Sequence, residues 1–317
     1  MSDQPIVTIV IPAYKAEKYI SQALESIKKQ IYSEWELLVV EDAFQDKTEL
    51  IVREFAQEFP DKRIEYIRHE TNKGLAATRN TAMRVARGKY ITFLDHDDIW
   101  CPQFLEKAVL ELEKEGVDLA FSTVQTFYED EFGTMQKIKE YGPSAEQLKL
   151  FPESLFIKNY IVPSATVINS NIINEVGYFD ENIRACEDYD YWLKIALRER
   201  AGKFIHLDGV NCLYRKHEAA LTKNTKLMNE TKLYVVKKYQ FHPKISSQLW
   251  KEKVFPIVIT LFELENNPWK SLNYLFFAFS VNPKNCLLTL TQKFRQQTKL
   301  KQRSRQLAGK IKRKVLP

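Results

Sequence analysis

The feature that most constrains the fold is a regular alternation of apolar runs and amphipathic segments over the first 125 residues. Short apolar runs rich in branched residues predict strands at residues 6–11, 35–40, 63–68, 90–94 and from 117 onward. The segments between them predict helices at residues 17–31, 46–59, 75–87 and 102–115. Strands that alternate with helices indicate βαβ units and a parallel sheet. Because crossovers between parallel strands are right-handed, the strands' carboxyl ends share one rim, where ligands bind in open α/β sheets.

The remainder of the chain has a different pattern. Between residues 130 and 220 it is mixed, and the expected elements are a strand or loop at 165–169, a helix at 187–199, and short strands near 203–206 and 210–215. From about residue 225 the pattern is helical, with aromatic-rich stretches at 254–264 and 272–281. We therefore expect an α/β fold with a mixed, mainly parallel sheet flanked by helices, followed by a C-terminal helical extension.

Composition narrows the class of protein. Of the 317 residues, 44% are hydrophobic and only 9 are Gly and 12 Pro, which excludes collagen and long disorder. Four Cys, none in a C-x-x-C pair, argue against a disulfide framework and a structural zinc site. The N-terminus has no basic region followed by an apolar stretch, and no run approaches the roughly 18 apolar residues that span a bilayer. We expect a cytoplasmic protein without a signal peptide.

The net charge of +6 conceals two opposite regions. No acidic residue follows Glu265, whereas residues 266–317 contain 12 of the 47 basic residues. The first 265 residues therefore carry 35 basic and 41 acidic residues, a balance of −6. The basic end could bind an anionic membrane surface, with solvated charge as the ordinary alternative. Nucleic acid is not expected as a partner, because the terminal segment lacks aromatic residues interleaved with basic ones.

Polar residues follow four successive predicted strands. They are Pro12-Ala13-Tyr14, Glu41-Asp42, the segment from Asn72-Lys73-Gly74 to Arg79-Asn80, and Asp95-His96-Asp97-Asp98. An aromatic ring can pack against a base, an arginine can pair with a diphosphate, and Asp-x-Asp can hold a hard divalent cation. Three carboxylates within four residues repel one another unless a cation is present. Each group alone has an ordinary explanation as a loop, cap or turn, but their position on one rim favours a ligand site.

These motifs, in this order, resemble the family 2 glycosyltransferases with a GT-A fold, over roughly residues 5–220. The resemblance implies a nucleotide-diphosphosugar donor, usually a UDP-sugar, a Mn²⁺ or Mg²⁺ ion, and inversion at the anomeric carbon. By similarity, the nucleotide-sugar would be bound by Pro12, Ala13, Tyr14, Glu17, Asp42, Gly74, Arg79, Asp95, His96, Asp97 and Arg215. The metal ligands would be Asp97, Asp95 and His217. One departure is Glu41-Asp42-Ala43-Phe44, where members often have Asp-Asp-Gly-Ser.

Inverting transfer also requires a base that takes the proton from the acceptor hydroxyl. The candidate segment runs from Cys186 to Trp192 at the start of a predicted helix, where acidic residues have an ordinary role as helix-dipole partners. The resemblance implies that Asp188 is the base and that Glu187 positions it or contacts the acceptor. Trp192 is expected in the core. The resemblance further implies that the segment containing Arg215 and His217 folds over the diphosphate.

The predicted function is transfer of a sugar from a UDP-sugar, or another nucleotide-diphosphosugar, to an acceptor hydroxyl in polysaccharide, glycolipid or glycoprotein synthesis. The acceptor would be a glycan or lipid-linked sugar, and the enzyme would be peripheral on the inner face of the plasma membrane. We expect a catalytic domain at residues 1–224, with a nucleotide-binding half to 125 and an acceptor half from 126. A helical extension at 225–292 and a basic tail at 293–317 would follow.

Two other functions stay open. A sugar-phosphate nucleotidyltransferase shares the α/β arrangement but usually begins with a glycine-rich phosphate loop, in place of which this chain has Pro12-Ala13-Tyr14. A non-catalytic nucleotide-sugar-binding subunit would not need Asp97 and Asp188. A dinucleotide-dependent dehydrogenase has no support, because G-x-G-x-x-G is absent after the first strand.

Overall fold

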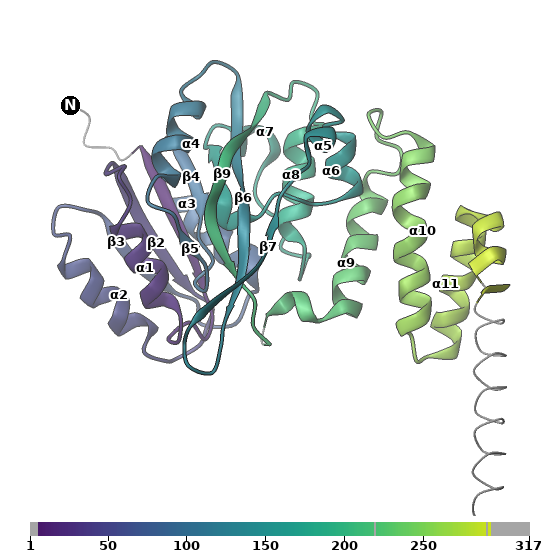
Figure 1. Ribbon diagram of the computed structural model, residues 1–317, viewed down its shortest axis with the longest axis horizontal. Coiled ribbons are helices and arrows are strands. Elements are labelled where there is room, and N and C mark those ends of the chain that lie inside the picture. The colour runs from purple at the N-terminus through teal and green to yellow at the C-terminus, as the bar shows by residue number, and fades with distance from the viewer. Residues whose placement is uncertain (1–5, 219, 290, 293–317) are drawn as a thin grey trace, which may run out of the picture. The chain divides into compact units, whose positions relative to one another are not determined.

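The computed structural model describes residues 6–218, 220–289 and 291–292, and it contains a central sheet with helices on both sides (Figure 1). The strands are β1 (Val7–Ala13), β2 (Trp35–Glu41), β3 (Ile64–Arg68), β4 (Tyr90–Phe93), β5 (Ile99–Trp100), β6 (Val117–Glu129), β7 (Met135–Tyr141), β8 (Thr166–Asn169) and β9 (Lys203–Arg215). Their order across the sheet is β3-β2-β1-β4-β8-β6-β9-β5, and β7 pairs with β6 outside this path.

The helices between residues 6 and 218 surround this sheet. They are α1 (Ile20–Lys28), α2 (Thr48–Gln57), α3 (Leu75–Val85), α4 (Phe104–Leu112), α5 (Ala145–Lys149), α6 (Glu153–Ile157), α7 (Ile172–Val176) and α8 (Glu187–Leu197). Successive strand residues point to opposite faces of the sheet. Ile9 and Leu37 lie in the core that includes residues of α1, α2 and α4. Phe93, on the other face, contacts Trp192 of α8 with ring centroids 6.5 Å apart.

Strand pairing confirms the mixed α/β sheet expected from the sequence. Parallel pairing joins β3, β2, β1 and β4, and it also joins β6 to β9. The strand β8 is antiparallel to both β4 and β6, and it connects the two parallel groups. The carboxyl ends of β1, β2, β3 and β4 therefore meet at one rim, as the βαβ pattern predicts.

The second half of the sheet differs from expectation in two respects. The two short strands expected near residues 203–206 and 210–215 form one strand, β9. Asp208-Gly209 interrupts the apolar pattern, but a register shift against β6 and a positive φ of 74° at Gly209 keep the strand continuous. The strand β7 was not expected, because its sequence is mostly polar and it lies exposed at an edge.

The chain divides into two compact units, residues 1–231 and 232–317. Helix α9 (Thr225–Lys238) contains the division, and the second unit contains α10 (Ser247–Leu264) and α11 (Pro268–Val281), which pack together. Ser246 caps α10 by accepting a hydrogen bond from the Leu249 amide, and Asn267 caps α11 in the same way. Among the described helices, none is long and apolar enough to cross a membrane. The expected basic tail, residues 293–317, lies outside the described residues.

Candidate active site

The carboxylate of Asp42, directly after β2, organises the loop that precedes α3. Its Oδ1 accepts hydrogen bonds of 2.8 Å from His69 Nδ1 and from the Lys73 amide, and its Oδ2 accepts one of 2.8 Å from the Gly74 amide. Gly74 has φ of +89°, a conformation that favours glycine, and stands immediately before α3. Asp42 is buried. Its carboxylate, which was predicted to contact the nucleotide-sugar, therefore holds the 72–74 loop at the rim.

Tyr14 is the exposed member of the Pro12-Ala13-Tyr14 segment at the end of β1. Its ring lies 5.5 Å from that of Phe44, which follows β2, so two aromatic rings stand together on the rim. Glu17 accepts a hydrogen bond of 3.1 Å from the Lys47 amide at the start of α2. A planar base would find an aromatic surface here, while Glu17 is engaged in holding the neighbouring loop.

The three aspartates after β4 have three different environments. Asp97 Oδ2 lies 2.8 Å from His217 Nε2, and this hydrogen bond, with nearby His96, outweighs burial and holds the pKa of Asp97 below its ordinary value. Asp95 forms an ion pair of 2.7 Å with Arg79. Asp98 is buried and accepts a hydrogen bond from the Arg215 amide, and burial raises its pKa well above the ordinary value. Only Asp97 of the three therefore faces His217.

His96 is turned toward the end of β1. Its Nδ1 lies 3.2 Å from the carbonyl oxygen of Pro12 and donates a hydrogen bond to it in the matching tautomer. The residue was predicted among the nucleotide-sugar contacts. The structure places it between two rim segments, where it joins the acidic loop to the Pro12-Ala13-Tyr14 segment.

Arg215, at the end of β9, is buried and joins this strand to β6, to the acidic loop after β4 and to Tyr19, which precedes α1. Its guanidinium forms an ion pair of 2.7 Å with Glu129 and donates to the Asp97 carbonyl at 2.8 Å. Its Cζ lies 4.5 Å from the ring centroid of Tyr19 and 4.6 Å from that of Phe127. Arg215 was predicted to contact the diphosphate. The structure shows its charge already paired, so its observed contacts position the acidic loop and the His217 segment.

Arg79 of α3 is buried between the acidic loop after β4 and the start of α8. Besides Asp95, its guanidinium forms an ion pair with Glu187. Its Cζ lies 5.7 Å from the ring centroids of both Phe93 and Phe179. The two carboxylates raise the pKa of Arg79 against the opposing effect of burial, so it stays charged. Arg79 was predicted near the nucleotide, and it is found beneath the site, joined to two predicted site residues.

Asp188 is partly exposed in the first turn of α8, where Glu187 is buried. Its Oδ2 accepts a hydrogen bond of 2.8 Å from Asn159 Nδ2. Burial of the carboxylate, reinforced by the negative charge of Glu187, raises the pKa of Asp188 to about 7, although Arg79 acts in the opposite direction. A carboxylate with a pKa near 7 can accept a proton at neutral pH.

The predicted metal ligands are only partly gathered. Asp97 and His217 lie together, but Asp95 is occupied by Arg79. Among the described residues, no group of three or more His, Cys, Asp or Glu side chains is arranged to hold a metal ion. Mg²⁺ is usually bound through one or two carboxylates together with substrate phosphates and water. Asp97 and His217 fit such a partial site, which a bound diphosphate would complete.

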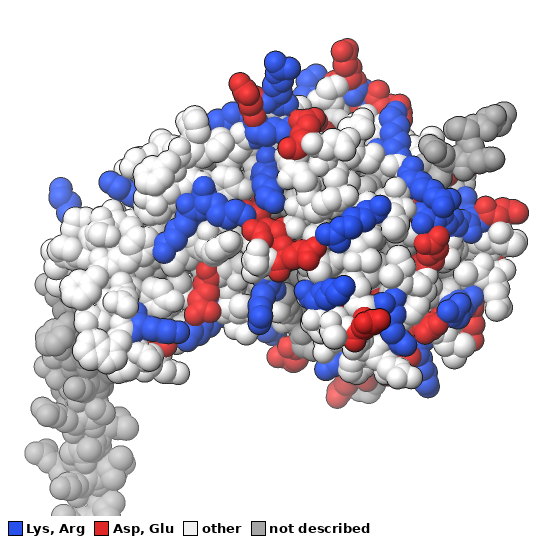
Figure 2. All heavy atoms as spheres, turned by 180° about the vertical axis from the view of Figure 1, so that it is seen from behind, with Lys and Arg blue, Asp and Glu red and all other residues white. Residues whose placement is uncertain are grey.

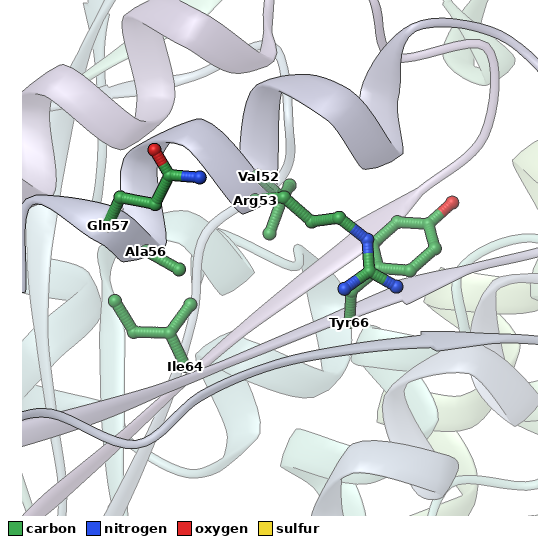
Figure 3. Close-up of a pocket in the computed structure, with 6 residues that line it drawn as sticks. All are labelled: Val52, Arg53, Ala56, Gln57, Ile64 and Tyr66. Atoms are coloured by element: carbon green, nitrogen blue, oxygen red, sulfur yellow. The ribbon is translucent and has the colours of Figure 1, made fainter. Parts of the chain in front are cut away.

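Sequence reasoning did not identify Asn159, because a single Asn in an irregular segment carries no motif. Trp192 is fully buried, as expected, and its neighbour Tyr191 is fully buried as well. The hollow between α2 and the edge strand β3, lined by Val52, Arg53, Ala56, Gln57, Ile64 and Tyr66, contains none of the predicted site residues (Figure 3).

Comparison with known proteins specifies the family to which this chain belongs. Residues 8–177 match the family described as glycosyl transferase family 2, and the chain belongs to this family. An uncharacterized glycosyltransferase of Methanocaldococcus jannaschii is 36% identical over 61% of this chain and 65% of its own length. An Escherichia coli enzyme, UDP-Glc:alpha-D-GlcNAc-diphosphoundecaprenol beta-1,3-glucosyltransferase WfgD, is 30% identical over 70% of this chain and 81% of its own.

Two solved structures share the fold. S. aureus TarS 1–349 in complex with UDP-GlcNAc has a TM-score of 0.66 at 19% identity, covering 88% of this chain and 82% of that one. The mannosyltransferase PcManGT of Pyrobaculum calidifontis, in complex with GDP-Man and Mn²⁺, has a TM-score of 0.62 at 18% identity, covering 92% and 80%. The GT-A fold implied by the sequence resemblance is confirmed.

Proposed function

We propose that this protein is a metal-dependent, inverting glycosyltransferase that moves a sugar from a UDP-sugar to an acceptor hydroxyl. The observation that carries the proposal is the environment of Asp188, whose carboxylate has a raised pKa and is held by Asn159 in the first turn of α8. It acts as the base that takes the acceptor proton while the acceptor oxygen attacks the anomeric carbon. Glu187 and Arg79 beneath it fix the first turn of α8.

On the donor side, Tyr14 and Phe44 offer their rings to the base, and the 72–74 loop held by Asp42 lies beside them. Asp97 and His217 would hold the divalent cation. When bound, such a cation neutralises negative charge that develops on the departing nucleoside diphosphate. The protein's own contribution is to keep these two side chains together, because Arg215 ties the acidic loop to the end of β9.

The acceptor is proposed to be a lipid-linked or polymeric glycan, used at a membrane surface on the cytoplasmic side. Support comes from the relative WfgD, whose name specifies a diphosphoundecaprenol-linked acceptor and a UDP-linked donor. PcManGT was solved with GDP-Man and TarS with UDP-GlcNAc, so both bases occur on this fold. The choice of UDP over GDP is thus the part of the proposal that most requires a direct test.

The test is a donor screen with UDP-, GDP- and dTDP-sugars, with hydrolysis and thermal stabilisation measured with and without Mn²⁺. We expect metal-dependent hydrolysis and stabilisation by UDP-sugars. A preference for another base would overturn the UDP assignment. Release of pyrophosphate from a nucleoside triphosphate and a sugar phosphate would instead favour a nucleotidyltransferase. If nucleotide-sugars stabilise the protein in thermal melts but are neither hydrolysed nor transferred to any of the glycan or lipid-linked acceptors supplied, the result would favour a non-catalytic binding subunit.

A further inference from the structure

Helix α11 has two unlike faces. On the inner face, Phe277 packs against Trp250 of α10 with ring centroids 6.5 Å apart, and Ala278 and Val281 are buried. The opposite face, here called the outer stripe, exposes 78% of Trp269, 40% of Leu272, 66% of Phe276 and 47% of Phe279. At 100° per residue these four positions fall within an arc of roughly 80°. The outer stripe is therefore a continuous apolar surface along the helix.

The apolar surface has a second part directly after α11. Residues 283–289 are helical, and Leu287 and Leu288 are each more than half exposed. Single exposed apolar residues are ordinary, but contiguous ones mark sites of interaction with proteins or membranes. An occupant for this surface has to be inferred from the charge that accompanies it.

The positive charge of the sequence around α11 favours an anionic surface as the occupant. Residues 266–317 contain 12 basic residues and no acidic one, so the apolar surface lies within a uniformly cationic stretch of sequence. On the face of the molecule shown in Figure 2, by contrast, acidic and basic side chains are intermingled. Helix α11 itself has one basic residue, Lys270, and ten of the 12 basic residues lie at 293–317. An exposed apolar helix face combined with a nearby cluster of Lys and Arg is typical of segments that lie in the headgroup region of a bilayer. Trp is favoured there because its ring tolerates both water and lipid.

We propose that the outer stripe of α11 docks this protein on the surface of an anionic lipid bilayer, to which the positive charge of residues 266–317 attracts it. This surface belongs to the second unit and contains none of the predicted nucleotide-sugar-site residues, and a lipid-linked acceptor, as in the proposed function, would be used at the same membrane. Docking inserts Trp269, Phe276 and Phe279 at headgroup depth, and the basic residues contact anionic headgroups.

Trp269 provides an intrinsic reporter of this event. The other four tryptophans, Trp35, Trp100, Trp192 and Trp250, are all buried, so a lipid-induced change in fluorescence reports mainly on α11. We expect vesicles of phosphatidylcholine with phosphatidylglycerol to shift the emission to shorter wavelength, and brominated lipid to quench it. Vesicles of phosphatidylcholine alone should bind at least tenfold more weakly. Raising NaCl from about 0.05 to 0.5 M should weaken binding to the anionic vesicles.

The variant Phe276→Ser/Phe279→Ser should bind anionic vesicles at least tenfold more weakly in co-sedimentation. The matched control is Phe132→Ser, an exposed phenylalanine in the β6–β7 turn, which should bind as the wild type does. Equal binding of the double variant and the wild type, or equal binding to neutral and anionic vesicles, would overturn the proposal. So would concentration-dependent dimerisation that the double variant abolishes, without vesicle binding, since the stripe would then serve a second copy.

Nucleotide-sugar hydrolysis in solution, measured on the same samples, separates this inference from the proposed function. Both variants should hydrolyse donor at the wild-type rate, because the substituted residues lie outside the candidate active site. Loss of vesicle binding with intact hydrolysis leaves the proposed function in place. Intact vesicle binding without any donor hydrolysis or transfer would contradict the proposed function and leave the docking surface established.

Discussion

The side-chain amide of Asn159 donates a 2.8 Å hydrogen bond to Oδ2 of Asp188, and so joins the segment after α6 to the first turn of α8. The backbone carbonyl of Asn159 in turn accepts a hydrogen bond from the Tyr141 hydroxyl at the end of β7. The hydrogen bond from Tyr141 fixes the backbone of Asn159, so the side-chain amide of Asn159 can orient the carboxylate of Asp188. Because this bond stabilises the charged form, it also lowers the pKa of Asp188 below the value that burial alone would give.

Replacing Asn159 by Ala should raise the pKa of Asp188 and move the acidic limb of the pH–rate profile to higher pH. For a rise of about one pKa unit, we expect kcat/KM at pH 7 to fall about fivefold, since the ionised fraction of Asp188 drops from about one half to about one tenth. Affinity for the nucleotide, measured by calorimetry with UDP, should stay within about twofold. The control is Asn182→Ala, an exposed residue whose side chain has no contact with Asp188. An unchanged acidic limb in Asn159→Ala would contradict the role of this hydrogen bond.

Replacing Asp188 by Asn should remove the base while it preserves shape. General-base catalysis contributes typically 10²- to 10⁴-fold, so transfer should drop by about that factor. Donor binding should persist, because no described contact joins Asp188 to the rim segments after β1 and β2. Single-turnover transfer and calorimetric donor binding measure the two effects separately. Normal turnover in this variant would refute the base assignment.

The pH dependence of the wild-type enzyme follows from the raised pKa of Asp188. A base must be unprotonated, so kcat/KM should be half-maximal near pH 7 and should fall tenfold for each pH unit below it. The negative charge of Glu187 contributes to this high pKa, and Glu187→Gln should therefore shift the acidic limb to lower pH. A shift to higher pH in Glu187→Gln would contradict the conclusion that the negative charge of Glu187 raises the pKa of Asp188.

Arg79 and Arg84 of α3 provide a comparison of buried and exposed arginines. Arg79→Ala leaves the buried Glu187 without its partner, and the free energy of unfolding should fall by about 3–5 kcal/mol. Arg84 is half exposed and pairs with Glu181 at 3.0 Å, so Arg84→Ala should cost only about 0–1 kcal/mol. Urea denaturation measures both values. Similar small losses in the two variants would mean that the buried charges are compensated in another way.

Chelation by EDTA should abolish donor hydrolysis, and added Mn²⁺ should restore it. Asp97→Asn should lower hydrolysis at least about 10²-fold and should also weaken the stabilisation by Mn²⁺ with UDP in thermal melts. The matched control is Asp130→Asn, in the exposed turn between β6 and β7, which should behave as the wild type does. Full hydrolysis in EDTA would exclude the cation from the proposed mechanism.

The nucleotide half of the fold could be predicted from the sequence, because local periodicity determines βαβ units. Strands β1 to β4 and the start of β6 occur where the apolar runs lie. The second half could not be predicted to the same extent, since β7 and β9 are defined by pairing with distant strands. Within the candidate site, the structure places Asp97 beside His217, and the resemblance had implied both as metal ligands. The burial of Arg79 and Arg215 could not be foreseen, because it depends on partners such as Glu187, 108 residues away in the sequence.

The ion pairs of Arg79 have a consequence for how this protein can diverge. One buried cation is shared by Asp95, in the acidic loop, and Glu187, in the motif at the start of α8. Loss of Arg79 leaves Glu187 as an uncompensated charge in the interior, which is strongly destabilising, whereas loss of one carboxylate leaves Arg79 paired with the other. Replacement of Arg79 by an uncharged residue should therefore be eliminated by selection. Among homologous chains, Arg79 is expected to be lost only where Glu187 is lost with it.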